Sequence, residues 1–148
     1  MAGSGKAHMR PDGDTVLTVE DLTVEFKLGK DKIVKAVSGV SFDLVRGETL
    51  AVVGESGCGK TMTALAILGS LPDSGIHVES SGIEINGRDI SGLSASQRRE
   101  VLGRDIAMIF QQPGTALDPV FTIGRQIHAV YGRHRGGNEQ YGRQPYWY

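Results

Sequence analysis

The stretch Gly54-Glu55-Ser56-Gly57-Cys58-Gly59-Lys60-Thr61 decides how the surrounding chain should fold. It has the spacing G-x-x-x-x-G-K-[ST], which is a specific structural signal only when a strand precedes it and a helix follows it. The apolar run Thr49–Val53 predicts a fully buried strand before it, and Lys60–Leu71, apolar nearly all round, predicts a buried helix after it. Glycines let the backbone curl so that successive N–H groups point at one anion, and the helix adds the positive end of its dipole. The stretch therefore predicts a phosphate-binding loop.

Two side chains at the end of this loop suit a nucleotide with its metal ion. Lys60 can neutralise the β- and γ-phosphates, and Thr61 can place its hydroxyl on Mg²⁺. One alternative is a glycine-rich turn without a ligand. Another is a GTPase, since Asp89–Gly92 fits the D-x-x-G element by letter, but the sequence holds no N-K-x-D element. Gly3–Lys6 repeats part of the loop pattern without a strand before it, and we interpret it as flexible leader.

The composition and charge of the chain argue against a nucleic-acid-binding, a disulfide-bonded or a membrane-spanning protein. The 148 residues fit one domain, and 16 Lys and Arg balance 17 Asp and Glu, so no general attraction to nucleic acid is expected. Cys58 is the only cysteine, which excludes an internal disulfide. The apolar runs are too short to span a bilayer, and the N-terminus lacks the apolar region of a signal peptide. We expect a cytoplasmic protein without direct membrane insertion.

The N-terminal half should contain mainly strands. Residues 1–14 are rich in Gly, Ser, Asp and Pro and are expected to form a disordered leader. Leu17–Phe26 alternates in two phases separated by Glu20-Asp21, which predicts a half-buried strand with a bulge or turn. Ile33–Val37 and Val40–Val45 predict two further short strands, followed by a turn at 46–48.

The second half mixes short strands and helices. Asn86-Gly87 predicts a tight turn between strands 82–85 and 88–90. Ser94–Gln97 forms a capping box that should open a polar helix ending near Leu102. Further expectations are a buried strand at Ile106–Phe110, a helix near Ile123–Tyr131 and an irregular tail at 132–148.

These motifs together resemble the ATP-binding subunits of ABC transporters. The resemblance rests on the loop itself, on Arg46–Leu50 before it and on the spacing to Met108–Gln111. It implies an α/β fold, a partial P-loop NTPase core with an antiparallel β portion, over residues 15–131. Ile106–Gln111 and Ala116–Pro119 resemble the oligopeptide, dipeptide and nickel importer branch. Gln112 and Gly114 depart from that branch, where an acidic residue and methionine are usual.

The resemblance assigns roles to residues outside the loop. Phe26 stands where the family places an aromatic ring that stacks on adenine, and Gln111 opens the Q-loop that touches Mg²⁺ and the attacking water. The alternatives are a core residue for Phe26 and a solvated loop residue for Gln111. Thr61 and Gln111 are the residues expected at Mg²⁺. The residues expected to contact ATP are Phe26, Gly54, Glu55, Ser56, Gly57, Cys58, Gly59, Lys60, Thr61 and Gln111.

The family's L-S-G-G-Q signature and its Walker B element are not found after Gln111. Leu93–Arg99 mimics the signature but precedes Gln111 and lacks both glycines. We therefore expect the N-terminal part of an ABC ATP-binding subunit, an ATPase by family that is inactive alone. The resemblance implies partners: transporter membrane subunits and a second ATP-binding subunit, at the inner face of the cell membrane. The alternatives are a non-catalytic nucleotide-binding or interaction fragment and another P-loop enzyme such as a kinase.

Overall fold

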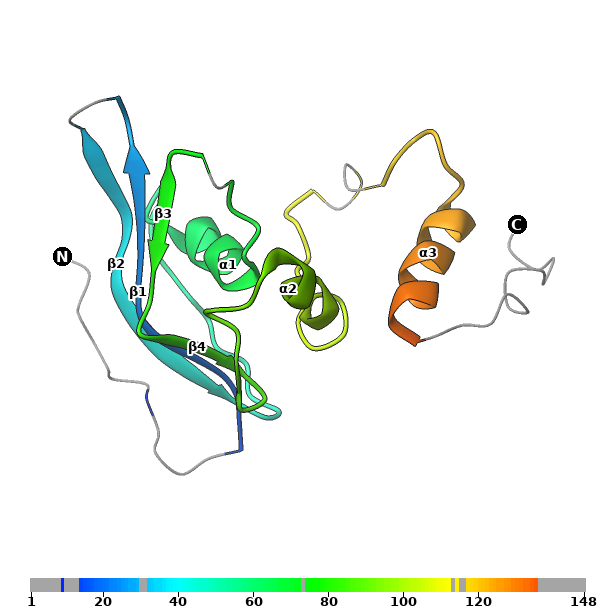
Figure 1. The fold of residues 1–148 in the computed structure, drawn as a ribbon, viewed down its shortest axis with the longest axis horizontal. Helices are drawn as coiled ribbons and strands as arrows, with labels where there is room; N and C mark the ends of the chain where they lie inside the picture. Colours follow the sequence, from blue (N-terminus) through cyan, green and yellow to red (C-terminus); the bar gives the residue numbers. More distant parts are fainter. Residues whose placement is uncertain are drawn as a thin grey trace. The chain divides into compact units, whose positions relative to one another are not determined.

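The structure is a computed structural model of the 148-residue chain (Figure 1). It describes Met9, Gly114 and residues 14–29, 32–72, 74–112 and 117–135. The chain divides into two compact units, Met1–Arg98 and Arg99–Tyr148, and each is described by itself. Most of the expected leader and residues 136–148 of the expected tail lie outside the described residues.

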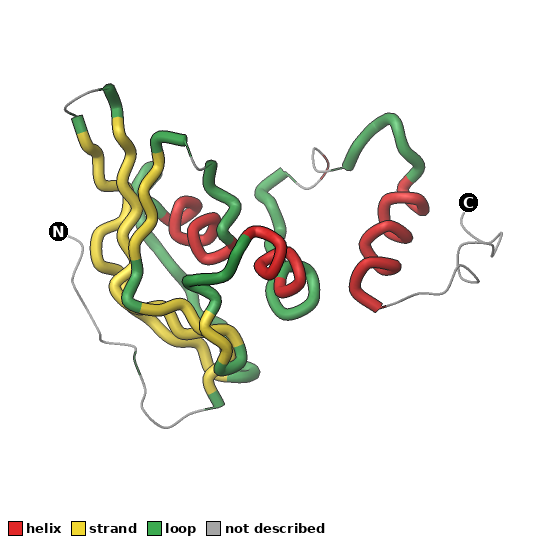
Figure 2. Tube along the Cα trace, viewed as in Figure 1, coloured by secondary structure: helices red, strands yellow, loops and turns green. Residues whose placement is uncertain are grey.

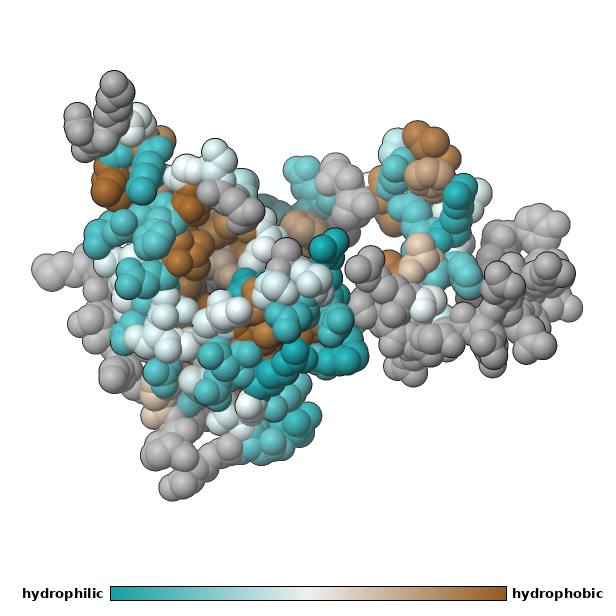
Figure 3. All heavy atoms as spheres, in the orientation of Figure 1, coloured by the Kyte–Doolittle hydropathy of each residue, from teal (hydrophilic) through white to brown (hydrophobic). Residues whose placement is uncertain are grey.

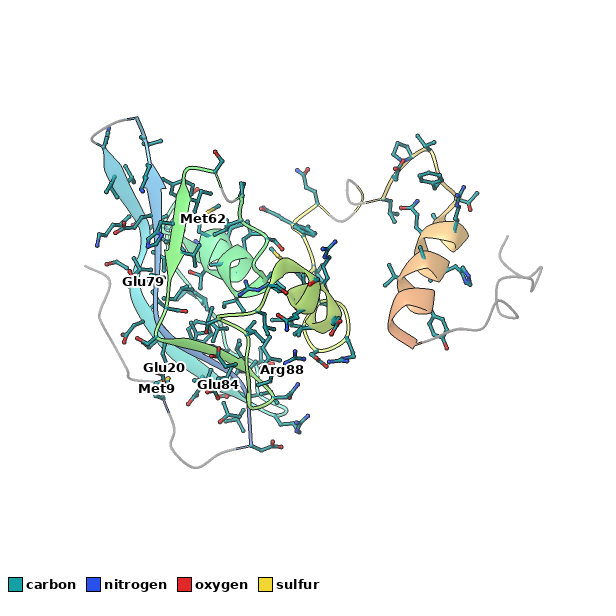
Figure 4. All side chains as sticks on the ribbon, viewed as in Figure 1. Met9, Glu20, Met62, Glu79, Glu84 and Arg88 are labelled. Atoms are coloured by element: carbon teal, nitrogen blue, oxygen red, sulfur yellow. The ribbon has the colours of Figure 1, made fainter. Side chains whose placement is uncertain are left out.

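The N-terminal unit is built on an antiparallel sheet whose central strand is β1. Its strands are β1 (Thr15–Lys27), β2 (Ile33–Val45), β3 (Ile76–Glu79), β4 (Gly82–Ile85) and β5 (Arg88–Asp89). The order across the sheet is β2-β1-β4-β5, and β3 also pairs with β1. Figure 4 labels Glu20, Glu84 and Arg88, which lie exposed on β1, β4 and β5. The antiparallel β portion that the sequence predicts is therefore present.

The expected irregularity in β1 is confirmed. Asp21 adopts a left-handed conformation with φ of 49°, and the register with β2 shifts between Val19 and Leu22. The Asp21 carboxylate accepts hydrogen bonds from the hydroxyls of Ser41, at 3.3 Å, and Ser81, at 3.2 Å. The bulge keeps both Val19 and Leu22 on the buried side of the sheet, because it changes the phase of the alternation between them.

The expectation of two separate strands at Ile33–Val37 and Val40–Val45 is wrong, because β2 is continuous from Ile33 to Val45. Gly39 lies in the interior of this strand with φ of 60°, and its N–H donates to Thr23 Oγ1 at 3.1 Å. A glycine takes this conformation without a steric penalty. The break in the sequence pattern is thus a bulge within one strand.

The hairpin at Asn86-Gly87 is confirmed, since these residues have φ of 50° and 74° and join β4 to β5. Just beyond it, the Asp89 carboxylate accepts hydrogen bonds from the hydroxyl and the N–H of Ser91, at 2.6 and 2.8 Å. These bonds hold the pKa of Asp89 below its usual value.

Strand β3 is absent from the sequence expectations. Its short alternation of Ile76 and Val78 forms a strand because β1 lies beside it and pairs with it.

Helix α1 (Lys60–Leu68) follows the glycine loop and is three residues shorter than the expected Lys60–Leu71. It ends at Gly69, whose φ of 62° stops the helix. The N–H groups of Gly69 and Ser70 donate to the carbonyls of Ala66 and Leu65, both at 2.9 Å, which is a Schellman ending. Its last turn, Ala66–Leu68, is buried, as the apolar pattern predicts.

Two expected buried strands are not strands in the structure. Residues 49–53 run as an extended segment without strand pairing, drawn as loop between β2 and α1 in Figure 2, and the side chain of Val53 is 87% exposed. In the C-terminal unit, Ile106–Phe110 forms only an isolated bridge from Ile106 to Leu102, and Ile109 is 90% exposed. A strand requires a partner for its backbone N–H and C=O groups. Among the described residues, no strand is paired with either segment.

The remaining helices are α2 (Ala95–Val101) and α3 (Ile123–Arg135). The capping box is confirmed: the Ser94 N–H donates to Gln97 Oε1 at 3.0 Å, and the Gln97 N–H donates to Ser94 Oγ at 3.4 Å. Helix α3 extends beyond the expected Tyr131 to Arg135. Over the part of the chain that the structure describes, no helix has the length and apolar character needed to cross a membrane.

Candidate phosphate-binding site

The glycine loop at residues 54–59 connects the extended segment to α1 in the conformation that its glycines allow. Gly57 and Gly59 have φ of 82° and 96°, a region that residues with a Cβ rarely adopt. The Cys58 N–H donates to the Glu55 carbonyl at 3.3 Å and closes a turn within the loop. The backbone therefore has the curled form that the sequence predicts for a phosphate cradle.

Gly59 also fixes the loop against the sheet. A Cβ at this position would overlap the carbonyl oxygen of Ala36 and lie 3.3 Å from Val37 Cγ2. The end of the loop thus rests directly on the backbone of β2. The sequence contains no local signal for this contact, because it joins residues more than 20 positions apart and depends on how α1 packs against the sheet.

Lys60 directs its side chain back into the loop. Its Nζ donates to the carbonyls of Gly54 and Glu55, both at 2.7 Å, and lies 3.3 Å from Cys58 Sγ. Cys58 itself is exposed. The ammonium group is therefore held at the centre of the loop, where it can meet an anion that the loop N–H groups attract.

The first turn of α1 favours an anion as well. Gly59 is its N-cap and has no side chain that could bond to the first N–H groups, and no acidic residue occupies the first turn. Such an N-terminus offers its N–H groups and the positive end of the helix dipole to a ligand. Thr61 is exposed in this turn, next to Lys60.

The other expected site residues lie on several elements of the chain. Glu55 and Ser56 are exposed within it. Phe26 is half-buried on β1, opposite Val34 of β2 and Ile76 of β3. Gln111 is exposed and belongs to the C-terminal unit, so it is described within that unit alone. The roles of Phe26 and Gln111 therefore stay predictions.

Neighbouring side chains contribute packing rather than chemistry. Met62, labelled on α1 in Figure 4, is partly buried. Figure 3 shows hydrophobic atoms gathered on the face of the N-terminal unit where β3 and α1 lie, with hydrophilic atoms around them.

Within the described ranges, no group of three or more His, Cys, Asp or Glu is placed to hold a metal ion by itself. The role of the Thr61 hydroxyl at Mg²⁺ therefore stays a prediction.

The glycine loop, Lys60 and the helix that follows them are features of the P-loop NTPase fold. Comparison with protein families narrows the class. Residues 37–144 match the model of the ABC transporter family, and the chain belongs to that family.

Similar proteins include several ATP-binding proteins of bacterial importers. A probable peptide ABC transporter ATP-binding protein, y4tR, of Sinorhizobium fredii is 47% identical over 117 residues, which are 79% of this chain and 35% of that protein. The dipeptide transport ATP-binding protein DppD of Bacillus subtilis is 45% identical over 122 residues, 82% of this chain and 36% of DppD. The glutathione import ATP-binding protein GsiA of Escherichia coli O157:H7 is 44% identical over 134 residues, 87% of this chain and 21% of GsiA. The chain thus spans between about a fifth and about a third of the length of these relatives.

Proposed function

We propose that the chain binds MgATP at Gly54–Thr61 as part of the ATP-binding subunit of an ABC importer. The observation that carries the proposal is the position of Lys60 Nζ, held within the loop by two carbonyls at 2.7 Å and next to an uncapped helix N-terminus. A polyphosphate would meet the loop N–H groups, the ammonium and the helix dipole at the same point. Family membership supports ATP as the nucleotide.

The transported solute follows from the relatives rather than from the loop. The names of three similar proteins refer to peptide, dipeptide and glutathione transport. A peptide or a related solute is therefore the proposed cargo of the whole transporter. The partners proposed with it are membrane subunits that form the pathway and a second ATP-binding subunit, with the chain on the cytoplasmic face of the membrane.

Three further assignments belong to this proposal. Phe26 stacks on adenine, which suits the flat face of an aromatic side chain. Gln111 contacts Mg²⁺ and the attacking water, as in the family. Residues 15–131 form the N-terminal part of the ABC ATP-binding domain.

Equilibrium binding of MgATP to the 148-residue chain tests the central claim. Lys60→Ala removes a charged hydrogen-bond donor, and the loss of about 1.5–3 kcal/mol predicts a Kd about 10- to 150-fold weaker. Lys32→Ala is the matched control, because it removes the same charge from an exposed position between β1 and β2. Superimposable titration curves for the wild type and Lys60→Ala would exclude the loop as the phosphate site.

A further inference from the structure

The Lys60 ammonium has an acceptor for each of its donors within the loop. An ammonium group carries three N–H donors. Its three neighbours are the carbonyl oxygens of Gly54 and Glu55, both at 2.7 Å, and Cys58 Sγ at 3.3 Å. A phosphate oxygen that bonds to Lys60 must therefore replace one of these three acceptors.

Cys58 Sγ is placed to be that acceptor. A Cβ built on Gly54 would overlap Cys58 Sγ and lie 3.9 Å from Lys60 Nζ, so the thiol folds inward over Gly54 toward the ammonium. Sulfur is a weak acceptor, whereas a carbonyl oxygen is a strong one. A phosphate oxygen carries negative charge, and its bond to an ammonium is about twice as strong as a neutral hydrogen bond.

We propose that Cys58 competes with the nucleotide for Lys60, and that phosphate binding exchanges the Lys60–Cys58 contact for a Lys60–phosphate bond. The carbonyls of Gly54 and Glu55 keep the ammonium in place during this exchange. The side chain at position 58 thereby influences the affinity for MgATP, because it determines how strong a contact of Lys60 the phosphate must replace. This inference rests on the proposed function, since it requires MgATP to bind at the loop.

The proposal predicts an order of affinities among variants at position 58. Cys58→Ser supplies a stronger acceptor to Lys60, whose flexible four-carbon stem can follow the shorter side chain. If the hydroxyl oxygen strengthens the competing bond by about 0.5–1.5 kcal/mol relative to the weak sulfur acceptor, MgATP should bind about 2- to 10-fold more weakly to Cys58→Ser than to the wild type. Cys58→Ala removes the competitor and should bind MgATP at least as tightly as the wild type.

A double-mutant cycle separates this competition from a change in loop shape. Calorimetric titration of MgATP is carried out on the full-length wild type, Cys58→Ser and Cys58→Ala, and on the same three chains carrying Lys60→Ala in addition. The effect of Cys58→Ser should disappear in the Lys60→Ala background, because the competition acts only through the ammonium. A merely structural effect of the serine would remain there. Circular dichroism of each variant checks that the fold is kept.

The outcomes distinguish the two proposals. Binding by Cys58→Ala at least as tight as by the wild type and weakest binding by Cys58→Ser, with the effect of the serine lost in Lys60→Ala, supports the competition, and weaker binding by Cys58→Ala than by the wild type overturns it. Saturable MgATP binding to the wild type with equal or tighter binding to Cys58→Ser overturns the competition and leaves the proposed function standing. A serine effect that persists in Lys60→Ala overturns it in the same way. Absence of saturable binding to the wild type overturns both.

Discussion

Substitution of Gly59 by alanine tests how tightly the glycine loop is fixed to the sheet. The φ of 96° at this position costs a residue with a Cβ about 1–2 kcal/mol. The added Cβ also overlaps the carbonyl oxygen of Ala36, a backbone atom that cannot turn aside as a side chain end would. Overpacking of this kind costs about 1–3 kcal/mol. Gly59→Ala should therefore destabilise the contact between loop and β2 by about 2–5 kcal/mol.

Gly57→Ala is the matched control. Its φ of 82° carries a similar backbone penalty, but among the described residues, apart from its two chain neighbours, no atom lies within 4 Å of the added Cβ. This variant should lose only about 1–2 kcal/mol. The difference between the two variants isolates the contact with Ala36, because both replace a loop glycine in a left-handed conformation by the same residue.

Native-state hydrogen exchange, read by mass spectrometry, measures the effect where it occurs. For Gly59→Ala, exchange should become about 30- to 4000-fold faster at the start of α1 and in peptides from residues 33–40. For Gly57→Ala, the increase should be about 5- to 30-fold and confined to the loop. Equal exchange in the two variants would refute the reasoning, since it would mean that the end of the loop does not rest on β2.

Three further predictions concern the loop thiol, turnover and pH. Because Cys58 is exposed within the loop, maleimide should modify it and saturating MgATP should slow the reaction; equal rates with and without MgATP would count against a ligand in the loop. The 148-residue chain alone should release almost no phosphate from ATP, because neither the signature nor the Walker B element is found in its sequence after Gln111. The loss of one electrostatic stabiliser of the transition state costs about 10²–10³ in rate; steady turnover abolished by Lys60→Ala would contradict this prediction. The lowered pKa of Asp89 means that its contribution to stability is complete above about its usual value of 3.8 and is lost as the pH falls through the lower folded-state pKa; a carboxyl NMR titration with a midpoint at or above the usual value would disprove it.

The features that sequence reasoning predicted correctly depend on neighbours in the chain. The phase change at Glu20-Asp21 predicts the β1 bulge because alternation is a property of a single strand. Asn86-Gly87 predicts its turn because both residues tolerate positive φ. The Ser94–Gln97 box forms because its two partners lie one helical turn apart.

The two strands that sequence reasoning predicted wrongly would require partner strands from distant parts of the chain. Thr49–Val53 and Ile106–Phe110 have the composition of buried strands, yet neither is paired as a strand within the described residues. Apolar composition shows that burial is favourable, but it does not supply the neighbouring strand. Strand β3 shows the converse: four residues with a weak pattern become a strand because β1 offers them an edge.

For the candidate site, the residue types alone predict the chemistry: a glycine loop, a lysine and a hydroxyl have the spacing that suits a phosphate and its metal ion. That spacing is local, so eight consecutive residues are enough to specify it. Two contacts become visible only in the folded chain: Gly59 rests on the carbonyl of Ala36, and Lys60 Nζ lies between two loop carbonyls and Cys58 Sγ. The first contact requires the sheet and α1 to pack together. The second depends on which way the lysine side chain turns, and residue type alone leaves that direction open because a flexible four-carbon stem has many rotamers.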